Sequence, residues 1–422
     1  MSEWNALSRT ELTQLLEESS SAYEKMKKLD LKLDLSRGKP SPDVLDLSNA
    51  YLNPPNTNTT EDGTDIRNYG APTGLPECKR LFSELLDIPP AQIFIGGNAS
   101  LQLMYDTFAM LYLFGLPEGT PWCKEDKIKV LCPCPGYDRH FNLAADFGAE
   151  LVVVPMTEDG PDMDIVEQLV ASDPSIKAMW NVPLYSNPQG IVYSNETVRR
   201  LAKMKTAAPD FKLLWDNAYG VHHIWKAYQI ENIFRLTEEA GNPERVLYFF
   251  STSKILFPGG GIGLVAAGPA TIKSIATHMS KQTIGYNKIP QLKTVELFQN
   301  AEGIHKHMQK IADLLRPKFE IVLNALEKEF SENGLLSWET PKGGYFVGVE
   351  TMDGCAKRTV ALAKEAGAVL TDAGATYPHK NDPRDSSIRI APTYPSLSEL
   401  QQTMDLFCIC VKIAALEKLL EK

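Results

Sequence analysis

The sequence contains no uninterrupted apolar segment of the roughly eighteen residues that a membrane-spanning helix needs. Cysteine is sparse: seven cysteines are spread over 422 positions and lack the dense spacing of a small disulfide-bonded domain. Positive charge is also scarce: 43 lysines and arginines face 53 aspartates and glutamates, which gives a formal charge of −10. These absences argue against a membrane protein, a disulfide framework and a nucleic-acid partner. Small anionic ligands must therefore be held by local basic residues.

Several motifs of nucleotide and metal sites are missing as well. Neither G-x-G-x-x-G nor G-x-x-x-x-G-K-[ST] occurs, so dinucleotide and nucleoside-triphosphate sites lose their usual support. The C-x-C pairs Cys132/Cys134 and Cys408/Cys410 lack nearby histidines, and we interpret them as packing residues, with no metal site expected. The first thirty residues form a polar amphipathic pattern without the apolar core of a signal peptide, which favours a cytoplasmic location.

Short apolar runs alternate with helical patterns between about residues 90 and 268. This alternation predicts βαβ units, and hence an α/β fold whose mostly parallel sheet is covered by helices on both faces. The seven predicted strands lie at 93–95, 128–131, 151–154, 176–180, 213–215, 246–250 and 264–267.

A second, smaller α+β body is predicted after this region. A long helical pattern over 292–330 leads out of the sheet region and connects the two bodies. It is followed by a strand near 345–349, a helix near 359–366, a short strand at 388–391 and a final helix at 397–420. A chain of 422 residues is too long for one ordinary core, which agrees with this division.

Lys254 is the most informative residue, because it follows the apolar run 248–250 inside the small-hydroxyl turn Ser251-Thr252-Ser253. A lone loop lysine is usually a solvated surface charge. Here apolar residues precede the lysine and the glycines 259–261 follow it, so we expect a partly desolvated amine with a lowered pKa.

Asp216, Tyr219 and Asn187 are predicted to lie beside this lysine. Asn187 precedes Asp216 by 29 residues, and Asp216 precedes Lys254 by 38, distances that fit crossovers between neighbouring parallel strands. All would then lie at the carboxyl ends of the strands, where such sheets bind ligands. Turn capping by Asp216 and an ordinary turn at Asn187-Pro188 remain the alternatives.

This combination suggests a pyridoxal 5′-phosphate (PLP) site. Lys254 supplies an amine for a Schiff base with the cofactor aldehyde, and Asp216 a carboxylate that keeps the pyridine nitrogen protonated. Tyr219 and Asn187 supply hydrogen-bond donors for the phenolic oxygen.

Other segments offer a phosphate cradle and a ring-stacking group. The turn Gly97-Asn98-Ala99-Ser100 joins a strand to a helix, where backbone amides and a hydroxyl can bind phosphate, although glycine-rich turns also occur for steric reasons alone. Tyr137 follows another strand and can stack on a heteroaromatic ring, its alternative being a core position.

Basic residues near both chain ends are candidates for substrate carboxylates. Arg389 lies between apolar residues, where it either forms a buried ion pair or clamps a substrate α-carboxylate in bidentate fashion. The segment Arg37-Gly38-Lys39 places two cations around a glycine, and either cation can meet a second carboxylate; solvated charge is the alternative.

Taken together, these residues resemble the class I and II aminotransferases of PLP fold type I, over about 34–395. The resemblance implies that Lys254 is the Schiff-base lysine, Asp216 the pyridine-nitrogen partner and Tyr219 and Asn187 the phenolic-oxygen ligands. It also implies roles for the remaining positions. These are ring stacking by Tyr137, phosphate binding by Ser100, Ser251 and the turn 97–99, cofactor binding by Ser253, and α-carboxylate binding by Arg389.

The resemblance further implies a homodimer with shared active sites, in which Tyr69 reaches the phosphate of the neighbouring subunit. Gly38 matches the substrate-side glycine of the N-terminal segment. The implied organisation is a large PLP-binding domain over 50–300 and a small domain formed by 1–49 and 301–422. The S-T-S-K-I and S-R-G-K-P segments are most similar to the aspartate aminotransferase subgroup Ic.

One departure concerns the phosphate. The family usually carries an arginine seven or eight residues after the lysine, but Gly261 and Ile262 occupy these positions here. Amides, hydroxyls or another cation such as Lys281 or Arg139 must then anchor the phosphate.

The expected activity is transfer of an amino group from an amino acid, preferably aspartate, to 2-oxoglutarate by a ping-pong mechanism. A PLP-dependent C–S lyase and a non-catalytic PLP-binding protein are the alternatives, since one fold supports several reactions. A dehydrogenase built on a similar sheet is disfavoured, because this sequence lacks the glycine fingerprint of such enzymes.

Overall fold

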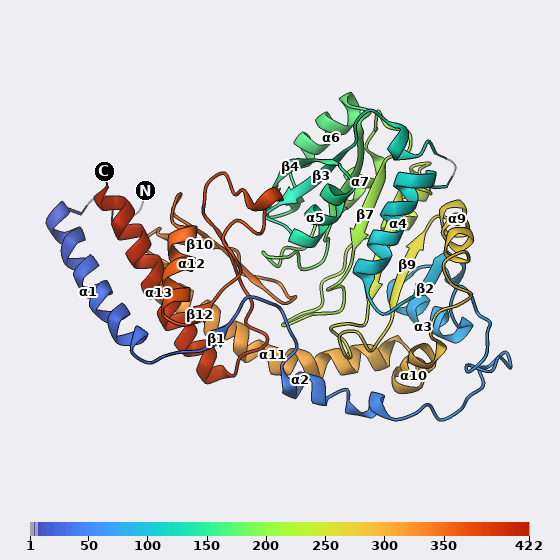
Figure 1. Cartoon of the computed structure of the whole chain (residues 1–422), viewed down its shortest axis with the longest axis horizontal. Coiled ribbons are helices and arrows are strands. Elements are labelled where there is room, and N and C mark those ends of the chain that lie inside the picture. The colour runs from blue at the N-terminus through green and yellow to red at the C-terminus, as the bar shows by residue number, and fades with distance from the viewer. Residues whose placement is uncertain (1–3, 5–6, 118, 422) are drawn as a thin grey trace.

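The computed structural model describes residues 4, 7–117 and 119–421 (Figure 1). Its larger sheet contains all seven predicted strands and a further two-residue strand, Gly160–Pro161, that the sequence analysis did not anticipate. In sheet order the strands are β2 (Ile93–Gly96), β9 (Gly263–Ala267), β8 (Val246–Ser251), β7 (Lys212–Asp216), β6 (Ile176–Asn181), β3 (Lys129–Cys134), β4 (Glu150–Thr157) and β5 (Gly160–Pro161).

The larger sheet is mostly parallel, as predicted. Strands β4, β3, β6, β7 and β8 pair in parallel, whereas β9 runs antiparallel to both β8 and β2. Alternate residues of β7 enter two different apolar clusters: Leu213 and Trp215 belong to one, and Leu214 to the other. Both faces of the sheet are therefore buried, which explains why its strands read as continuous apolar runs rather than alternating ones.

Helices cover both faces of this sheet (Figure 1). They are α3 (Pro76–Leu86), α4 (Ser100–Phe114), α5 (Asp138–Asp146), α6 (Met163–Ser172), α7 (Asn195–Lys203), α8 (Ile233–Glu239) and α9 (Pro269–Met279). Short 3-10 turns lie at η2 (Asn49–Leu52), η3 (Pro90–Gln92), η4 (Trp122–Lys124) and η5 (Pro378–Lys380).

The predicted long helix over 292–330 is two helices, α10 (Lys288–Phe298) and α11 (Ala301–Phe330). The break has a local cause. Gln299 adopts a left-handed φ of 64°, and the Asn300 side chain caps α11 by accepting a hydrogen bond of 3.0 Å from the Gly303 amide. The apolar periodicity continues across these two residues and therefore concealed the break from the sequence pattern.

The smaller body contains the predicted strands and helices and is formed from both chain ends. An antiparallel sheet consists of β10 (Leu336–Trp338), β11 (Val347–Thr351) and β13 (Ser387–Ile390), while β1 (Leu33–Asp34) pairs in parallel with β12 (Ala368–Val369). The helices are α1 (Arg9–Lys27), α2 (Pro42–Asp46), α12 (Ala356–Glu365) and α13 (Leu397–Leu420).

Helix α1 packs along α13, so that the first and last helices lie side by side (Figure 1). The exact domain limits at 49/50 and 300/301 remain a prediction. All seven cysteines are free thiols, and six of them are buried. Within the described ranges, no helix combines the length and the apolar character needed to cross a membrane.

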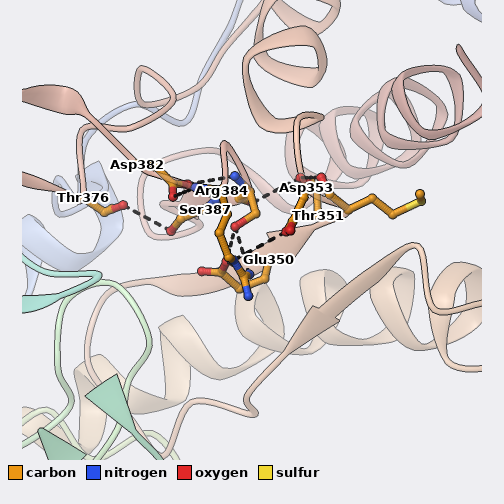
Figure 2. A network of polar contacts seen from close by, with 9 residues as sticks. Glu350, Thr351, Asp353, Thr376, Asp382, Arg384 and Ser387 are labelled. Atoms are coloured by element: carbon orange, nitrogen blue, oxygen red, sulfur yellow. Dashed lines mark hydrogen bonds and ion pairs between the residues drawn. The ribbon is translucent and has the colours of Figure 1, made fainter. Parts of the chain in front are cut away.

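A polar network fastens the start of β13 (Figure 2). The buried carboxylate of Asp382 accepts hydrogen bonds of 2.8 Å from the amides of Ser386 and Ser387. The Ser387 hydroxyl in turn accepts a hydrogen bond of 3.1 Å from Thr376. The Thr376 carbonyl accepts one of 2.8 Å from the Gly136 amide, which belongs to the larger body. The network therefore links the smaller sheet to the segment that precedes α5.

Substitution of Asp382 tests the importance of this network. Asp382→Ala leaves two buried amides without acceptors, so we expect it to lower the free energy of unfolding by about 1–3 kcal/mol. Asp353 is the control, because it pairs with Arg384 at 3.5 Å with 72% of its side chain exposed. Asp353→Ala should cost less than about 0.5 kcal/mol. Equal urea midpoints for the two variants would contradict this expectation.

Candidate active site

The candidate site lies at the carboxyl ends of the central strands. Asp216 is the last residue of β7, Lys254 follows β8, and Asn187 follows β6. A cavity of about 160 Å³ brings these residues together with other predicted positions. The predicted residues that line it are Ala99, Ser100, Tyr137, Asn187, Asp216, Tyr219, Ser251, Ser253 and Lys254. The crossover spacing in the sequence therefore predicted this juxtaposition.

Asp216 is buried, with 4% of its surface exposed. Its Oδ2 lies 2.9 Å from His140 Nε2, whereas its Oδ1 has no hydrogen-bond partner among the described residues. The His140 ring stacks on Trp180 with a centroid distance of 4.2 Å and an interplanar angle of 2°. Asp216 is thus held by a fixed imidazole and presents one free oxygen.

The sequence analysis missed His140. The residue lies in the first turn of α5, three positions after Tyr137, the extended residue that precedes the helix. Their rings meet edge to face, with centroids 5.0 Å apart. The only available signal was a histidine one helical turn after a candidate aromatic residue.

Lys254 is partly buried and faces aromatic rings. Its Nζ lies 4.8 Å from the ring centroid of Tyr219 and 5.8 Å from that of Tyr345. Burial lowers the pKa of Lys254 below its ordinary value of 10.5, as the sequence context predicted. Burial likewise raises the pKa of Tyr137 to about 12 and raises that of Tyr219. Both phenols therefore stay protonated and remain hydrogen-bond donors at neutral pH.

The predicted phosphate cradle surrounds the start of α4. Gly97 adopts a φ of +48°, and the Asn98 side chain donates a hydrogen bond of 2.7 Å to the Gly259 carbonyl. Ser100 begins α4, and this end of the helix borders the cavity. The first backbone amides of a helix have no acceptors within the helix, so they are free to bind a ligand. The Ser251 and Ser253 hydroxyls are hydrogen-bonded to each other at 3.2 Å. These groups can bind an anion without an arginine.

The structure also explains the departure at Gly261. A Cβ atom there would lie 2.0 Å from Thr252 Oγ1. That hydroxyl accepts a hydrogen bond of 2.9 Å from the Ile262 amide, so the turn leaves no room for an arginine. Neither Lys281 nor Arg139 lines the cavity, and both are exposed.

Arg389 projects from β13 of the smaller sheet. Its Nε donates a hydrogen bond of 3.3 Å to Thr371 Oγ1, and its Nη1 donates one of 3.2 Å to Asn187 Oδ1. The guanidinium lies 4.7 Å from the Phe346 ring centroid. Gly38 packs against the same ring, since a Cβ atom at Gly38 would lie 2.7 Å from Phe346 Cζ. The arginine is therefore fixed on three sides.

Six predicted residues do not line the cavity: Arg37, Gly38, Tyr69, Gly97, Asn98 and Arg389. Arg389 contacts its border through the hydrogen bond to Asn187, which does line the cavity. Arg37 is exposed, and Tyr69 is 76% exposed. An exposed Tyr69 is compatible with its predicted contact to a second subunit, which stays a prediction.

The site's residues fit a pyridine-based cofactor. Burying Asp216 Oδ1 without a partner is costly, and a protonated ring nitrogen would satisfy it. The amine of Lys254 and the start of α4 lie in the same cavity, where an aldehyde and a phosphate need them.

Comparison with known proteins identifies the family. A family model described as "Aspartate amino-transferase" matches residues 7–422. The chain belongs to this family. This aminotransferase is 46% identical to a putative aminotransferase of Mycolicibacterium smegmatis, over 99% of both chains. It is therefore a transaminase, as the sequence resemblance predicted, and acts on the general substrate classes of these enzymes, amino acids and 2-oxo acids.

Solved structures agree with this assignment. The aminotransferase superimposes on an aspartate transaminase from Corynebacterium glutamicum with a TM-score of 0.96 at 40% identity, covering 99% of each chain. An α-aminoadipate aminotransferase from Thermus thermophilus, complexed with N-(5′-phosphopyridoxyl)-L-leucine, matches with a TM-score of 0.73 at 21% identity over 92% of this chain and 93% of that one. The predicted PLP fold type I is confirmed.

The lowered pKa of Lys254 predicts a stability penalty in the cofactor-free protein. The penalty is complete below the folded-state pKa and disappears as the pH rises toward the ordinary value of 10.5, because the unfolded chain binds the proton more tightly. Lys254→Met should therefore raise the urea midpoint at pH 7, and the gain should shrink at pH 10. Lys273→Met, at an exposed position on α9, is the control. A gain that does not depend on pH would contradict this reasoning.

Proposed function

We propose that this transaminase uses PLP to move an amino group from aspartate to 2-oxoglutarate in two half-reactions of a ping-pong mechanism. The observation that carries the proposal is the placement of the Lys254 amine and the unpartnered Asp216 oxygen in one cavity. The name of the Corynebacterium glutamicum relative, an aspartate transaminase, supports aspartate as donor.

Seven side chains and one turn would hold the cofactor. Asp216 would hold the proton on the ring nitrogen, and His140 keeps this carboxylate in place. Tyr219 and Asn187 would donate to the phenolic oxygen, while Tyr137 would cover one ring face. The phosphate would bind the start of α4, the turn 97–99 and the hydroxyls of Ser100, Ser251 and Ser253. PLP, when bound, supplies an aldehyde that captures amines and a ring that withdraws electrons from the substrate Cα.

Lys254 is the proposed proton carrier. Because burial lowers the pKa of Lys254, its Nζ loses a proton more readily than the Nζ of an exposed lysine does. A neutral Nζ can accept the proton that leaves the substrate Cα and return it later in the transfer. The rings of Tyr219 and Tyr345 lie beside this amine and limit the directions from which solvent can reach it.

Arg389 is the proposed clamp for the substrate α-carboxylate. Its fork geometry suits a bidentate carboxylate. Gly38 allows the backbone to approach Phe346, whose ring lies beside the guanidinium. Arg37, Lys39 and Arg139 are the candidates for the distal carboxylate of aspartate. All three are exposed, and Lys39 also pairs with Asp34 at 3.3 Å. We also propose that the protein is a homodimer in which Tyr69 reaches the phosphate of the neighbouring subunit. We further propose a cytoplasmic location, and a large domain over 50–300 with a small domain formed by 1–49 and 301–422.

A single-turnover experiment tests the reaction. Holoenzyme mixed with aspartate alone should release about one equivalent of oxaloacetate per site, because the first half-reaction needs no acceptor. Other amino acids, tested one at a time, define the donor range. Release of oxaloacetate that requires 2-oxoglutarate would contradict the ping-pong scheme. Release of pyruvate and ammonia from a cysteine conjugate, without amino transfer, would support the C–S lyase instead.

Substitutions of Lys254 and Asp216 test the cofactor assignment. Lys254→Met should abolish turnover, since no other lysine among the described residues lines the cavity to carry the proton. Asp216→Ala should slow turnover by several orders of magnitude, because an unprotonated ring is a poor electron acceptor. Turnover is measured with saturating aspartate and 2-oxoglutarate, and Lys273→Met should match the wild type. Full activity in either site variant would contradict the assignment.

Substitution of Arg389 tests the substrate clamp. Arg389→Ala should weaken binding of aspartate and 2-oxoglutarate by roughly 2 to 5 kcal/mol, as expected for loss of a buried charge partner. Arg384→Ala is the matched control, because Arg384 pairs with Glu350 and Asp353 away from the cavity. An unchanged KM for both substrates in Arg389→Ala would remove this residue from the site.

A further inference from the structure

The carboxylate of Asp138 lies beside the proposed clamp. Asp138 is the first residue of α5, directly after Tyr137, and its Oδ1 is 3.9 Å from Arg389 Nη1. The Asp138 side chain is 32% exposed, whereas that of Arg389 is 10% exposed. One partner of this ion pair is therefore fixed in the interior, while the other borders solvent.

Arg389 lacks any other anionic partner among the described residues. Its two hydrogen bonds go to Thr371 and Asn187, which are neutral acceptors. A buried guanidinium without a nearby anion is strongly disfavoured, so the charge of Asp138 compensates that of Arg389.

The distance of 3.9 Å exceeds a hydrogen bond, so Asp138 compensates the charge without occupying a guanidinium donor. The donors that Thr371 and Asn187 leave free can then receive an incoming carboxylate. Two carboxylates at one guanidinium repel each other, and Asp138, which is partly exposed, has room to turn toward solvent. The fixed partners Thr371 and Asn187 keep the arginine in place during this exchange.

We propose that Asp138 is the resident counter-anion of Arg389 and sets substrate affinity by competing with the substrate α-carboxylate. It weakens the binding of every carboxylate ligand, and in return it keeps the empty clamp from capturing chloride or phosphate. This inference rests on the proposed role of Arg389 in substrate binding.

A structural role for Asp138 makes a different prediction. An acidic residue in the first turn of α5 also favours the helix, and its loss would lower stability by a small amount. Loss of helix stability alone would not tighten ligand binding.

The test compares Asp138→Asn with Asp146→Asn in the holoenzyme. Asp146 is exposed at the other end of α5, so its substitution makes the same change in net charge away from Arg389. The probes are propionate and succinate, which lack an amine and cannot react, and their dissociation constants are measured by calorimetry. Asp138→Asn should bind both about two- to fivefold more tightly, the range of a partly exposed ion pair. Its KM for aspartate should fall, and chloride should inhibit it more strongly, while Asp146→Asn should match the wild type.

The double variant Asp138→Asn/Arg389→Ala separates the possible failures. The tightening should vanish in the Arg389→Ala background, because the two residues act on the same ligand group. If Arg389→Ala itself binds succinate like the wild type, the proposed clamp is wrong. If Arg389→Ala weakens binding but Asp138→Asn leaves it unchanged or weaker, this inference alone is overturned. Asp138→Ser, which retains a good helix-start residue, replaces Asp138→Asn if the latter does not fold, and the same criteria apply.

Discussion

The burial of the Asp216 carboxylate is the constraint on which the rest of the site depends. A buried carboxylate with one unpartnered oxygen is unfavourable unless its surroundings are rigid and its partner is close. Here the parallel pairing of β7 with β6 and β8 fixes the backbone, and the stack of His140 on Trp180 fixes the second oxygen. The fold thus holds a polar arrangement in which one carboxylate oxygen stays available.

The same pattern recurs at the other charged groups of the site. Lys254 is held in an environment that lowers its pKa, and Arg389 is buried against neutral acceptors and an ion-pair partner at 3.9 Å. The charged form of each of these side chains is less stable in the folded protein than it would be in water. Stability is supplied instead by the two apolar clusters on the faces of the large sheet and by α11 and α13, which belong to the first of these clusters.

The sequence predicted the parts of this structure that depend on local pattern. Continuous apolar runs identified the seven strands because both sheet faces are buried, and crossover lengths placed Asn187, Asp216 and Lys254 at one edge. It did not predict His140, Thr371 or Asp138. Their importance comes from contacts with partners that are distant in the sequence, at separations of 76, 18 and 251 positions respectively. The break at Gln299 also escaped, since it depends on one left-handed residue within a continuing apolar period.

The site is divided between the two bodies, and this division has a mechanical consequence. The groups placed to hold a cofactor come from the larger sheet, whereas Arg389 comes from β13 of the smaller one. The two meet through Arg389 and Asn187, through Asp138 on α5, and through the Gly136–Thr376 hydrogen bond that connects to the network at Asp382 (Figure 2). If Arg389 is the substrate clamp proposed above, a bound carboxylate would act on contacts that join the bodies. The proposed clamp would then link substrate binding to the placement of the smaller body.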